Sequence, residues 1–222
     1  MDKLELTTGR LHRDVQEAGT TLIQVSLQHP LIAGGEGDMA DALNRCFSRT
    51  AENLVASLCQ EMIGEARAAL ELLPEALPYQ INGTFTTTYN APGALSLFTD
   101  IFLYAGGMRG ITYRYGSSFL TADGGRPLFL TALFPAAADL LGLVSDFVAD
   151  AYWKKQGLET LPESMIQAVR DAFSPENIYL TEGGLAVFYQ PGAIAPVADG
   201  VSVFTMPYDE AGPFDPAVLV GE

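Results

Sequence analysis

Residues 104–110, Tyr-Ala-Gly-Gly-Met-Arg-Gly, are the segment of this chain whose composition best suits ligand binding. Glycines expose backbone N–H groups, and successive N–H groups can form a concave site for an anion. Arg109 would add a planar guanidinium that donates paired hydrogen bonds to a carboxylate or phosphate. The simpler alternative, which we favour, is a turn that needs glycine for its positive φ. If the segment does bind a ligand, the candidate residues are Tyr104, Gly106, Gly107, Arg109 and Gly110.

The rest of the sequence shows no pattern typical of a catalytic or metal site. His12 and His29 lie in loop-like sequence with no clustered cysteine or histidine, whereas a zinc site needs three or four converging ligands. Asp146 and Asp150 are spaced to share one helix face, which is more typical of a solvated surface than of a catalytic pair. Motifs of serine hydrolases, zinc peptidases and phosphate-binding loops do not occur. We therefore predict no catalytic residues, no metal and no cofactor.

The chain is acidic, with a net charge of −15 over 222 residues. Residues 139–222 carry 13 acidic and 3 basic side chains, so most of the excess lies there. This balance argues against nucleic acid as a partner, because phosphate contacts need lysine and arginine. Solubility is the simplest explanation of the charge. The alternative is long-range attraction of a basic protein.

Two cysteines, Cys46 and Cys59, fall in one predicted helix. At 1.5 Å per residue they would be roughly 20 Å apart, whereas a disulfide needs Cα atoms within about 7 Å. We therefore expect two free, buried thiols. The N-terminus lacks the apolar segment of a signal peptide, and no later stretch of about 18 apolar residues suggests a membrane helix. Read as complete, the sequence would be that of a cytoplasmic protein.

The glycine segment is expected to connect strands of an antiparallel meander. Alternating apolar residues and glycine-bearing turns predict three neighbouring strands, at residues 79–89, 95–104 and 111–119. Upstream, residues 20–27 form a further predicted strand and residues 3–7 a weaker one. We expect a long hairpin loop at residues 10–19 and an exit loop at residues 29–35, where Pro30 and glycines interrupt pairing.

Helices and a second group of strands complete the predicted fold. Apolar residues at three- and four-residue steps predict a long helix from Asp38 to Leu73, which Gly64 could bend. The buried stripe should contain Met39, Leu43, Cys46, Phe47, Leu54, Leu58, Met62, Ala66 and Leu70 or Leu73. The rest of the pattern predicts two shorter helices ending near Gly157 and Phe173, a hairpin over residues 176–189, a strand over 201–206 and a tail over 209–222.

This order predicts an α+β fold, in which an antiparallel sheet packs against one long and two shorter helices. We expect residues 1–222 to form a single domain. Within it, residues 20–73 supply an N-terminal strand and the long helix, and residues 79–208 supply the meander, shorter helices and C-terminal hairpin.

Three segments carry a family resemblance: residues 176–208, with Ile194-Ala-Pro-Val-Ala-Asp-Gly200 and a last strand ending in Pro207-Tyr208; residues 95–110; and Leu130-Thr-Ala-Leu-Phe134. Together they resemble a bacterial family of unknown function. That family occurs in the extracellular part of RsiV-type anti-sigma factors, which are lysozyme receptors, and beside polysaccharide deacetylase domains. Met108-Arg109 stands where the family usually has Ala-His, and neither the RsiV anchor nor the deacetylase domain is present here.

The resemblance implies a non-catalytic recognition module of the bacterial cell envelope, and an extracytoplasmic location. Its expected partner is a basic, lysozyme-like protein or a cell-wall glycan. The alternative is a glycan-acting hydrolase whose two carboxylates converge only in space. A concave pocket with two acids would favour the enzyme, whereas an open acidic or aromatic face would favour binding.

Overall fold

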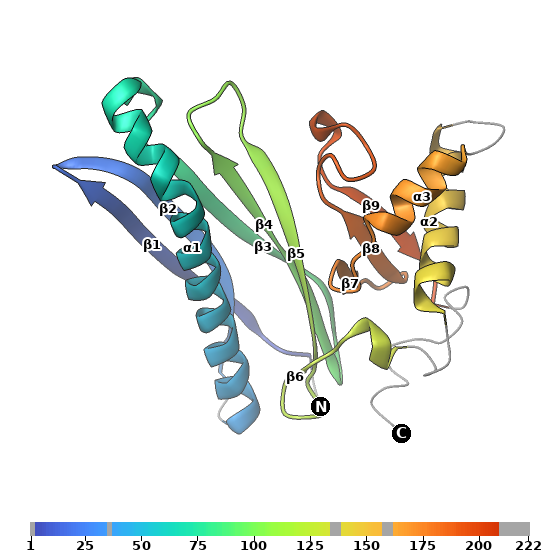
Figure 1. The fold of residues 1–222 in the computed structure, drawn as a ribbon. Helices are drawn as coiled ribbons and strands as arrows, with labels where there is room; N and C mark the ends of the chain where they lie inside the picture. Colours follow the sequence, from blue (N-terminus) through green and yellow to red (C-terminus); the bar gives the residue numbers. More distant parts are fainter. Residues whose placement is uncertain (1–2, 35–36, 134–138, 157–161, 209–222) are drawn as a thin grey trace. The chain divides into compact units, whose positions relative to one another are not determined.

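The structure, a computed structural model, describes residues 3–34, 37–133, 139–156 and 162–208. Within these ranges the chain forms a six-stranded sheet, a three-stranded sheet and three α-helices (Figure 1). It divides into two compact units. The N-terminal unit contains Leu4–Thr86 and Thr99–Tyr113, and the C-terminal unit contains Thr87–Phe98 and the described residues from Arg114 on. The predicted α+β class is confirmed.

The six-stranded sheet has the order β1-β2-β3-β4-β5-β6. Strands β1 and β2 form an antiparallel hairpin, and Ala18 and Gly19 turn it with positive φ angles of 50° and 84°. Strands β2 and β3 run parallel, from Ile23 opposite Tyr79 to Leu27 opposite Gly83, because the long helix connects them. The strand bounds are β1 Leu6–Glu17, β2 Thr20–Ile32, β3 Tyr79–Ala91, β4 Ala94–Tyr104, β5 Ile111–Leu120 and β6 Arg126–Pro127.

Both loops predicted in the N-terminal region are wrong, because residues 10–17 and 29–32 continue the strands of the first hairpin. His12 and His29 therefore lie in strands. The polar composition of residues 10–17 reflects the position of β1 at the edge of the sheet, where exposed charges are typical. Pro30 is accommodated because the register of β2 with β3 ends at Leu27, so that only β1 is its neighbour there.

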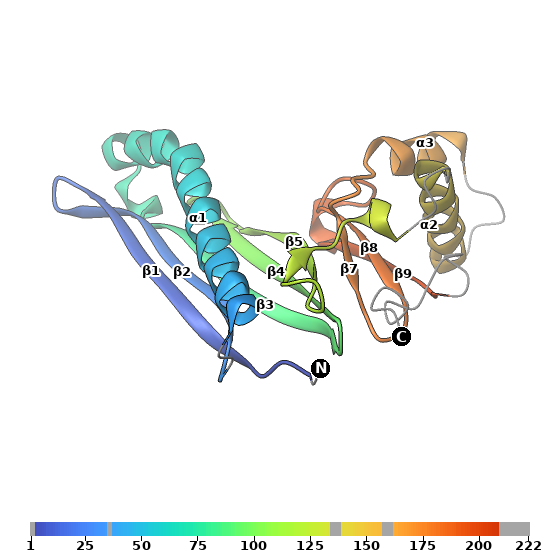
Figure 2. The same ribbon diagram turned by 90° about the horizontal axis from the view of Figure 1, so that it is seen from below.

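Helix α1, Asp38–Leu72, lies along one face of the six-stranded sheet (Figures 1 and 2). Its buried residues pack against apolar residues of β2, β3 and β4, including Ile23, Ile81 and Ile101. The helix continues through Gly64 without a break. The buried stripe is Ala40, Leu43, Phe47, Ala51, Val55, Leu58, Met62, Ala66 and Ala69.

The predicted stripe of α1 is confirmed at Leu43, Phe47, Leu58, Met62 and Ala66 but differs elsewhere. The contact with the sheet uses Ala51, Val55 and Ala69, whereas Leu54 is only partly buried and Leu73, beyond the helix, is 49% exposed. The alanines let the helix approach the strands closely. The larger side chains of Leu54, Ile63 and Leu70 are partly buried at the margins of the contact.

Cys46 and Cys59 are free, as predicted, but both are partly rather than fully buried. Burial raises the pKa of the Cys59 thiol, and the nearby positive charge of Arg13 offsets part of that effect. Cys59 is therefore held in its protonated form, which is the less reactive form toward alkylating reagents.

The C-terminal unit has its own sheet, formed by β7 Ile178–Leu180, β8 Leu185–Tyr189 and β9 Ser202–Met206, all antiparallel. The predicted C-terminal hairpin is thus present, in a sheet separate from the meander. Helices α2, Leu140–Gln156, and α3, Glu163–Asp171, supply Val144, Val148, Tyr152 and Val169 to a core on one face of this sheet.

The other face of the three-stranded sheet packs Tyr179 and Phe188 against Phe98, which belongs to the same unit. Strands β7 and β8 are therefore buried on both faces, which explains their continuous apolar sequence. Sequence features expected at Phe134, Pro135, Gly157 and the tail 209–222 lie outside the described residues. No helix within the described ranges is long and apolar enough to cross a membrane.

Candidate functional site

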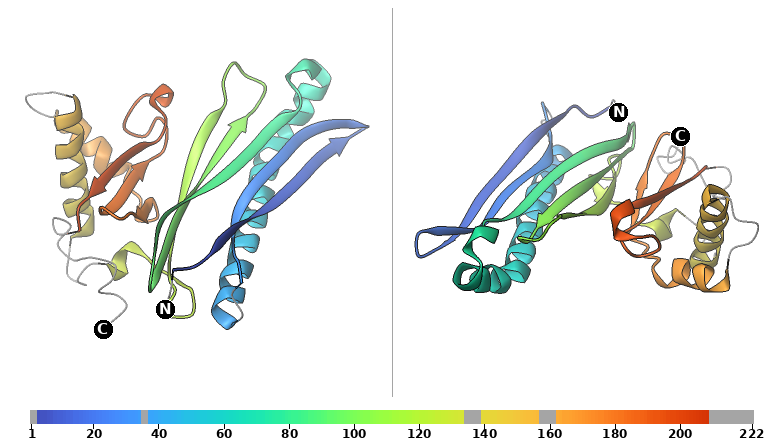
Figure 3. Two further views of the ribbon diagram at one scale, coloured as in Figure 1. Left: turned by 180° about the vertical axis from the view of Figure 1, so that it is seen from behind. Right: turned by 90° about the horizontal axis from the view of Figure 1, so that it is seen from above.

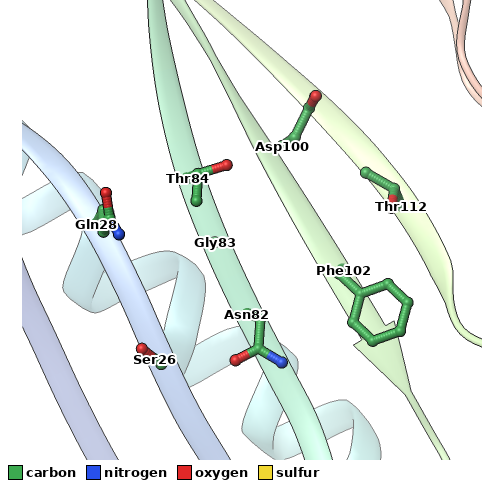
Figure 4. A pocket seen from close by; sticks show the side chains of 8 residues that line it. All are labelled: Ser26, Gln28, Asn82, Gly83, Thr84, Asp100, Phe102 and Thr112. Atoms are coloured by element: carbon green, nitrogen blue, oxygen red, sulfur yellow. The ribbon is translucent and has the colours of Figure 1, made fainter.

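A polar hollow of about 410 Å³ lies in the N-terminal unit, on the sheet (Figure 4). Seen from behind, the strands of this unit lie in front of α1 (Figure 3, left), so the sheet has one face that α1 does not cover. The volume lies within the range of about 300–1,000 Å³ that is usual for small-ligand pockets. The hollow is lined by Ser26, Gln28, Asn82, Gly83, Thr84, Asp100, Phe102 and Thr112.

Strand alternation places the lining residues together. In β2, the odd-numbered Val25 and Leu27 are buried in the core beneath α1, so Ser26 and Gln28 point to the opposite face. In β3, Tyr79 and Ile81 are buried in the same core, and Asn82 and Thr84 line the hollow with the opposite parity. The parallel register sets Ser26 directly beside Asn82. Residues more than fifty positions apart thus form one polar surface.

Gly83 lets the core approach the strand at the centre of the hollow. A Cβ atom there would lie 2.0 Å from Leu27 Cδ1 and 2.7 Å from Ile101 Cδ1. These side chains belong to the core beneath α1, so Gly83 permits close packing on that side. Its flanking residues, Asn82 and Thr84, face the hollow. The floor of the hollow is therefore supported directly by packed core residues.

The lining of the hollow can both donate and accept hydrogen bonds. Gln28 and Asn82 supply amides, and Ser26, Thr84 and Thr112 supply hydroxyls. Asn82 Nδ2 donates to Gln80 Oε1 at 3.3 Å, which helps to fix the orientation of the amide.

One aromatic side chain, Phe102, belongs to the lining and is 36% exposed. It adds an apolar surface beside the amides and hydroxyls. This combination suits a ligand that is rich in hydroxyl groups and has one apolar face.

Among the described residues that line the hollow, Asp100 is the only carboxylate. Glycoside hydrolysis commonly uses two carboxyl groups about 5–10 Å apart on either side of the scissile bond. Within the described ranges there is also no group of three or more histidine, cysteine, aspartate or glutamate side chains placed to hold a metal ion. The lining residues therefore do not include the usual pair of acids.

The predicted binding residues lie at the end of the β4–β5 hairpin, and none of them is among the residues that line the hollow. Tyr104 ends β4, two positions after Phe102, and therefore has the same parity in the strand. A Cβ atom at Gly110 would lie 2.3 Å from the Phe102 ring, so this glycine lets the ring pack against the backbone. Gly107 and Arg109 lie in the exposed part of the connection. The structure therefore brings Tyr104 and Gly110 close to Phe102.

Gly106 fits the alternative explanation of the glycine segment, a turn that needs positive φ. Its φ is +74°, and a Cβ atom there would lie 2.7 Å from Cβ of Ala76. Ala76 belongs to the short 3₁₀ helix Pro74–Ala76, which precedes β3. Both backbone conformation and close packing therefore require glycine at this position.

Asp146 and Asp150, the other carboxylates considered above, form surface ion pairs. Asp146 Oδ1 accepts from Arg170 Nη2 at 3.1 Å, and Asp150 Oδ2 pairs with Lys154 Nζ at 2.6 Å. Both aspartates are exposed. The expectation of a solvated helix face is confirmed.

Sequence reasoning missed the residues of the hollow, because they come from four strands and carry no motif. A signal was nevertheless present. In residues 24–28 and 80–86, the even positions hold glutamine, asparagine, serine or threonine. These uncharged side chains alternate with the buried positions and mark the strand face that carries the hollow.

Comparisons with known proteins connect the chain to a family without an assigned function. Residues 131–209 match the family model described as "Protein of unknown function (DUF3298)". No curated protein matches the sequence.

Two solved structures share the fold. A DUF3298 family member from Bacteroides fragilis is 16% identical, with a TM-score of 0.71 over 100% of this chain and 97% of that chain. A DUF3298 family protein from Pseudomonas aeruginosa is 16% identical, with a TM-score of 0.65 over 95% of this chain and 98% of that chain. Residues 131–209 thus carry the DUF3298 match, and the chain as a whole has the fold of these two DUF3298 proteins.

Proposed function

We propose that this protein is a non-catalytic recognition module that binds a glycan in the hollow of its N-terminal unit. The observation that carries this proposal is the lining itself, in which amides and hydroxyls lie beside an exposed aromatic ring. The hollow is open, as a site for part of a longer chain must be (Figure 4).

Sugar hydroxyls donate and accept hydrogen bonds, and the lining side chains offer both functions. Gln28 and Asn82 each carry an N–H donor group and a carbonyl acceptor, and the serine and threonine hydroxyls can rotate to suit either role. The apolar face of a sugar ring would pack on Phe102, where burial of apolar surface contributes about 25 cal/mol per Å².

The same lining supports binding over hydrolysis. A conventional glycosidase would need a second carboxylate across the ligand from Asp100, and the lining residues supply none. Asp100 is therefore assigned to binding, as a hydrogen-bond acceptor for sugar hydroxyls.

The family resemblance favours a cell-wall glycan as the ligand and an extracytoplasmic location. Under this proposal the β4–β5 connection contributes to the contact surface, because Gly110 supports the Phe102 ring. Tyr104, Gly106, Gly107 and Arg109 would extend the contact along a longer glycan chain.

The test is isothermal titration calorimetry with neutral and acidic oligosaccharides, including chitotetraose and a muramic-acid-containing tetrasaccharide. Phe102→Ala and Asn82→Ala should each weaken binding about tenfold or more, which is the effect of losing about 1.4 kcal/mol. Matched controls are Phe129→Ala, at a phenylalanine that is 63% exposed in the C-terminal unit, and Asn53→Ala, on the exposed side of α1. The controls should bind like the parent protein.

Two results would overturn this proposal. Absence of binding to every oligosaccharide would remove the glycan assignment. Release of shortened products by the parent protein, lost in Asp100→Asn, would move the protein to the hydrolases. Circular dichroism of each variant establishes that the fold is retained.

A basic protein is the second candidate partner, and the exposed acids of the C-terminal unit favour it. They include Asp139, Glu163, Asp171, Glu176, Glu182 and Asp199. A C-type lysozyme is the first protein to test, in view of the RsiV resemblance. Binding by this route should weaken as the Debye length falls from about 30 Å at 0.01 M salt to about 8 Å at 0.15 M. It should not respond to Phe102→Ala.

A further inference from the structure

The edge strand β1 carries two basic side chains beside the hollow. In the β1–β2 register, Arg10 is opposite Gln28 and His12 is opposite Ser26. Directly opposed residues in an antiparallel pair project from the same face of a sheet. Gln28 and Ser26 line the hollow, so Arg10 and His12 are on its face, one strand spacing of about 4.8 Å further out.

Neither basic side chain has a hydrogen bond or ion pair with any other described residue, and both are exposed. By contrast, two other exposed arginines are paired: Arg67 Nε contacts Glu17 Oε2 at 2.7 Å, and Arg126 Nε contacts Asp123 Oδ2 at 2.8 Å. Arg10 and His12 therefore retain their donor groups for a ligand.

Two aspartates also lie on this face. Asp14 is opposite Gln24, on the side of His12 away from Arg10. Asp100 lies in β4, two strands beyond β2. The end of the face at Arg10 and Gln28 is therefore the part farthest from both aspartates. A negatively charged group is best accommodated there, with His12 as the next donor along the strand.

We propose that the glycan bound in the hollow is acidic, and that a carboxylate on it is held by Arg10 and His12. This inference rests on the proposed glycan-binding function. It adds a subsite for a charged substituent to a surface that otherwise contacts hydroxyl groups.

The chemistry of the two side chains fits a carboxylate. The guanidinium of Arg10 presents parallel N–H donors that match the two oxygens of a planar carboxylate, and charge-assisted bonds of this kind are roughly twice as strong as neutral ones. A ring N–H of His12 provides a further donor. Gln28 and Ser26 lie between these residues and β3, so a glycan can contact hollow and subsite together.

A single guanidinium balances the charge of a monoanion such as a carboxylate, but not that of a doubly charged phosphate. Asp14, on the same face of β1, adds to the repulsion of a second negative charge. The proposal is therefore specific to uronic or muramic acid units, and a phosphorylated oligosaccharide should bind more weakly than a carboxylate-bearing one.

The experiment compares tetragalacturonate and a muramic-acid-containing tetrasaccharide with their methyl esters, by isothermal titration calorimetry. At least one acid should bind about tenfold or more tightly than its ester. Arg10→Gln and His12→Gln should reduce this difference and leave binding of the ester unchanged. Arg45→Gln, at an exposed position on α1, removes the same charge from the other side of the sheet and should leave the difference intact.

Each outcome separates the subsite from the function on which it rests. Equal affinity for acid and ester, with binding lost in Phe102→Ala, overturns the carboxylate subsite and leaves the glycan-binding proposal standing. Equal effects of Arg10→Gln and Arg45→Gln overturn the subsite in favour of long-range charge. Tighter binding of a phosphorylated oligosaccharide overturns the choice of carboxylate. Failure of all the oligosaccharides to bind overturns the glycan proposal itself.

Discussion

Tyr189 should destabilise the fold through its hydroxyl group, and Tyr189→Phe should therefore stabilise the protein. The residue lies in β8 and is 0% exposed, with its ring 6.2 Å from that of Phe204 in an edge-to-face contact. Its hydroxyl has no hydrogen-bond partner among the described residues. Leaving a buried polar group unpaired costs about 1–3 kcal/mol. Removing only the oxygen keeps the ring contact, so we expect the free energy of unfolding to rise by about 1 kcal/mol or more.

The same burial should make the stability difference between Tyr189→Phe and the parent protein depend on pH. Burial raises the pKa of Tyr189 well above its ordinary value of 10.0. Above about pH 10 the unfolded chain loses the tyrosine proton while the folded chain keeps it, so the unfolded state becomes relatively more favourable. Ionisation of Tyr189 therefore has no effect on the free energy of unfolding below the unfolded pKa. As the pH rises from the unfolded pKa toward the folded pKa, it lowers the free energy of unfolding progressively. Tyr189→Phe should show less loss of stability between about pH 9 and pH 11.

Urea denaturation followed by circular dichroism measures both effects, and Tyr179→Phe is the matched control. Tyr179 is also buried, but its hydroxyl accepts a hydrogen bond from Arg114 Nη1 at 3.2 Å. Removing it should lower the free energy of unfolding by about 1.5–3 kcal/mol, the usual contribution of a hydrogen bond to a charged group. A loss of more than about 1 kcal/mol in Tyr189→Phe, or an unchanged slope with pH, would refute the reasoning.

Three further predictions concern the core and the thiols. Leu58→Ala should lower the free energy of unfolding by about 2–5 kcal/mol, because Leu58 is buried between α1 and the sheet, and Leu54→Ala should lower it clearly less. Equal denaturation midpoints for the two variants would contradict the side of α1 that is assigned to the core. Gly116→Ala should lower the free energy of unfolding by about 1–3 kcal/mol or more, because a Cβ atom there would lie 2.0 Å from the carbonyl oxygen of Ile178. An unchanged melting temperature would count against this close packing. Alkylation of Cys59 should be much slower in the folded protein than in urea. Because burial raises the pKa of this thiol, its alkylation rate should still rise with pH above about pH 9. Equal rates in the folded protein and in urea would show that the thiol is accessible.

The strands of the meander and of the C-terminal hairpin were predictable because burial imposes a readable pattern on them. Tyr79 and Ile81 alternate with polar residues over one buried face, and residues 185–189 are apolar throughout because both faces are covered. Glycine and proline then mark the connections between strands. In such segments the local sequence preference and the final packing favour the same secondary structure.

The first hairpin was harder to predict because β1 lies at an edge. Only Leu11 and Val15 of its central part pack against the α1 core, and charged residues between them resemble a loop. The phase of α1 was ambiguous for a different reason. Several leucines of the helix could occupy its buried face. Which side of the helix is buried depends on the sheet that it packs against, and that packing places Ala51 and Val55 in the core.

The hollow could not be predicted as a site from local sequence, because its geometry arises from strand pairing. Ser26 and Asn82 become neighbours only through the parallel register of β2 and β3, and a displacement of one residue would turn either strand's polar side chains toward the core. The glycine segment was a more visible candidate, but its glycines also meet the needs of a tight turn. The sequence signal of the hollow is the row of uncharged polar residues on one face of β2 and β3.

The hollow lies outside the segment that matches the family model. All of its lining residues precede residue 113, whereas the DUF3298 match begins at residue 131. Under the glycan proposal, substitutions at Gln28, Asn82 or Phe102 would change what is bound and leave the matching segment untouched. Proteins collected through that segment should then contain several ligand preferences, and grouping them by the polar positions of β2, β3 and β4 should sort those preferences more faithfully than overall identity.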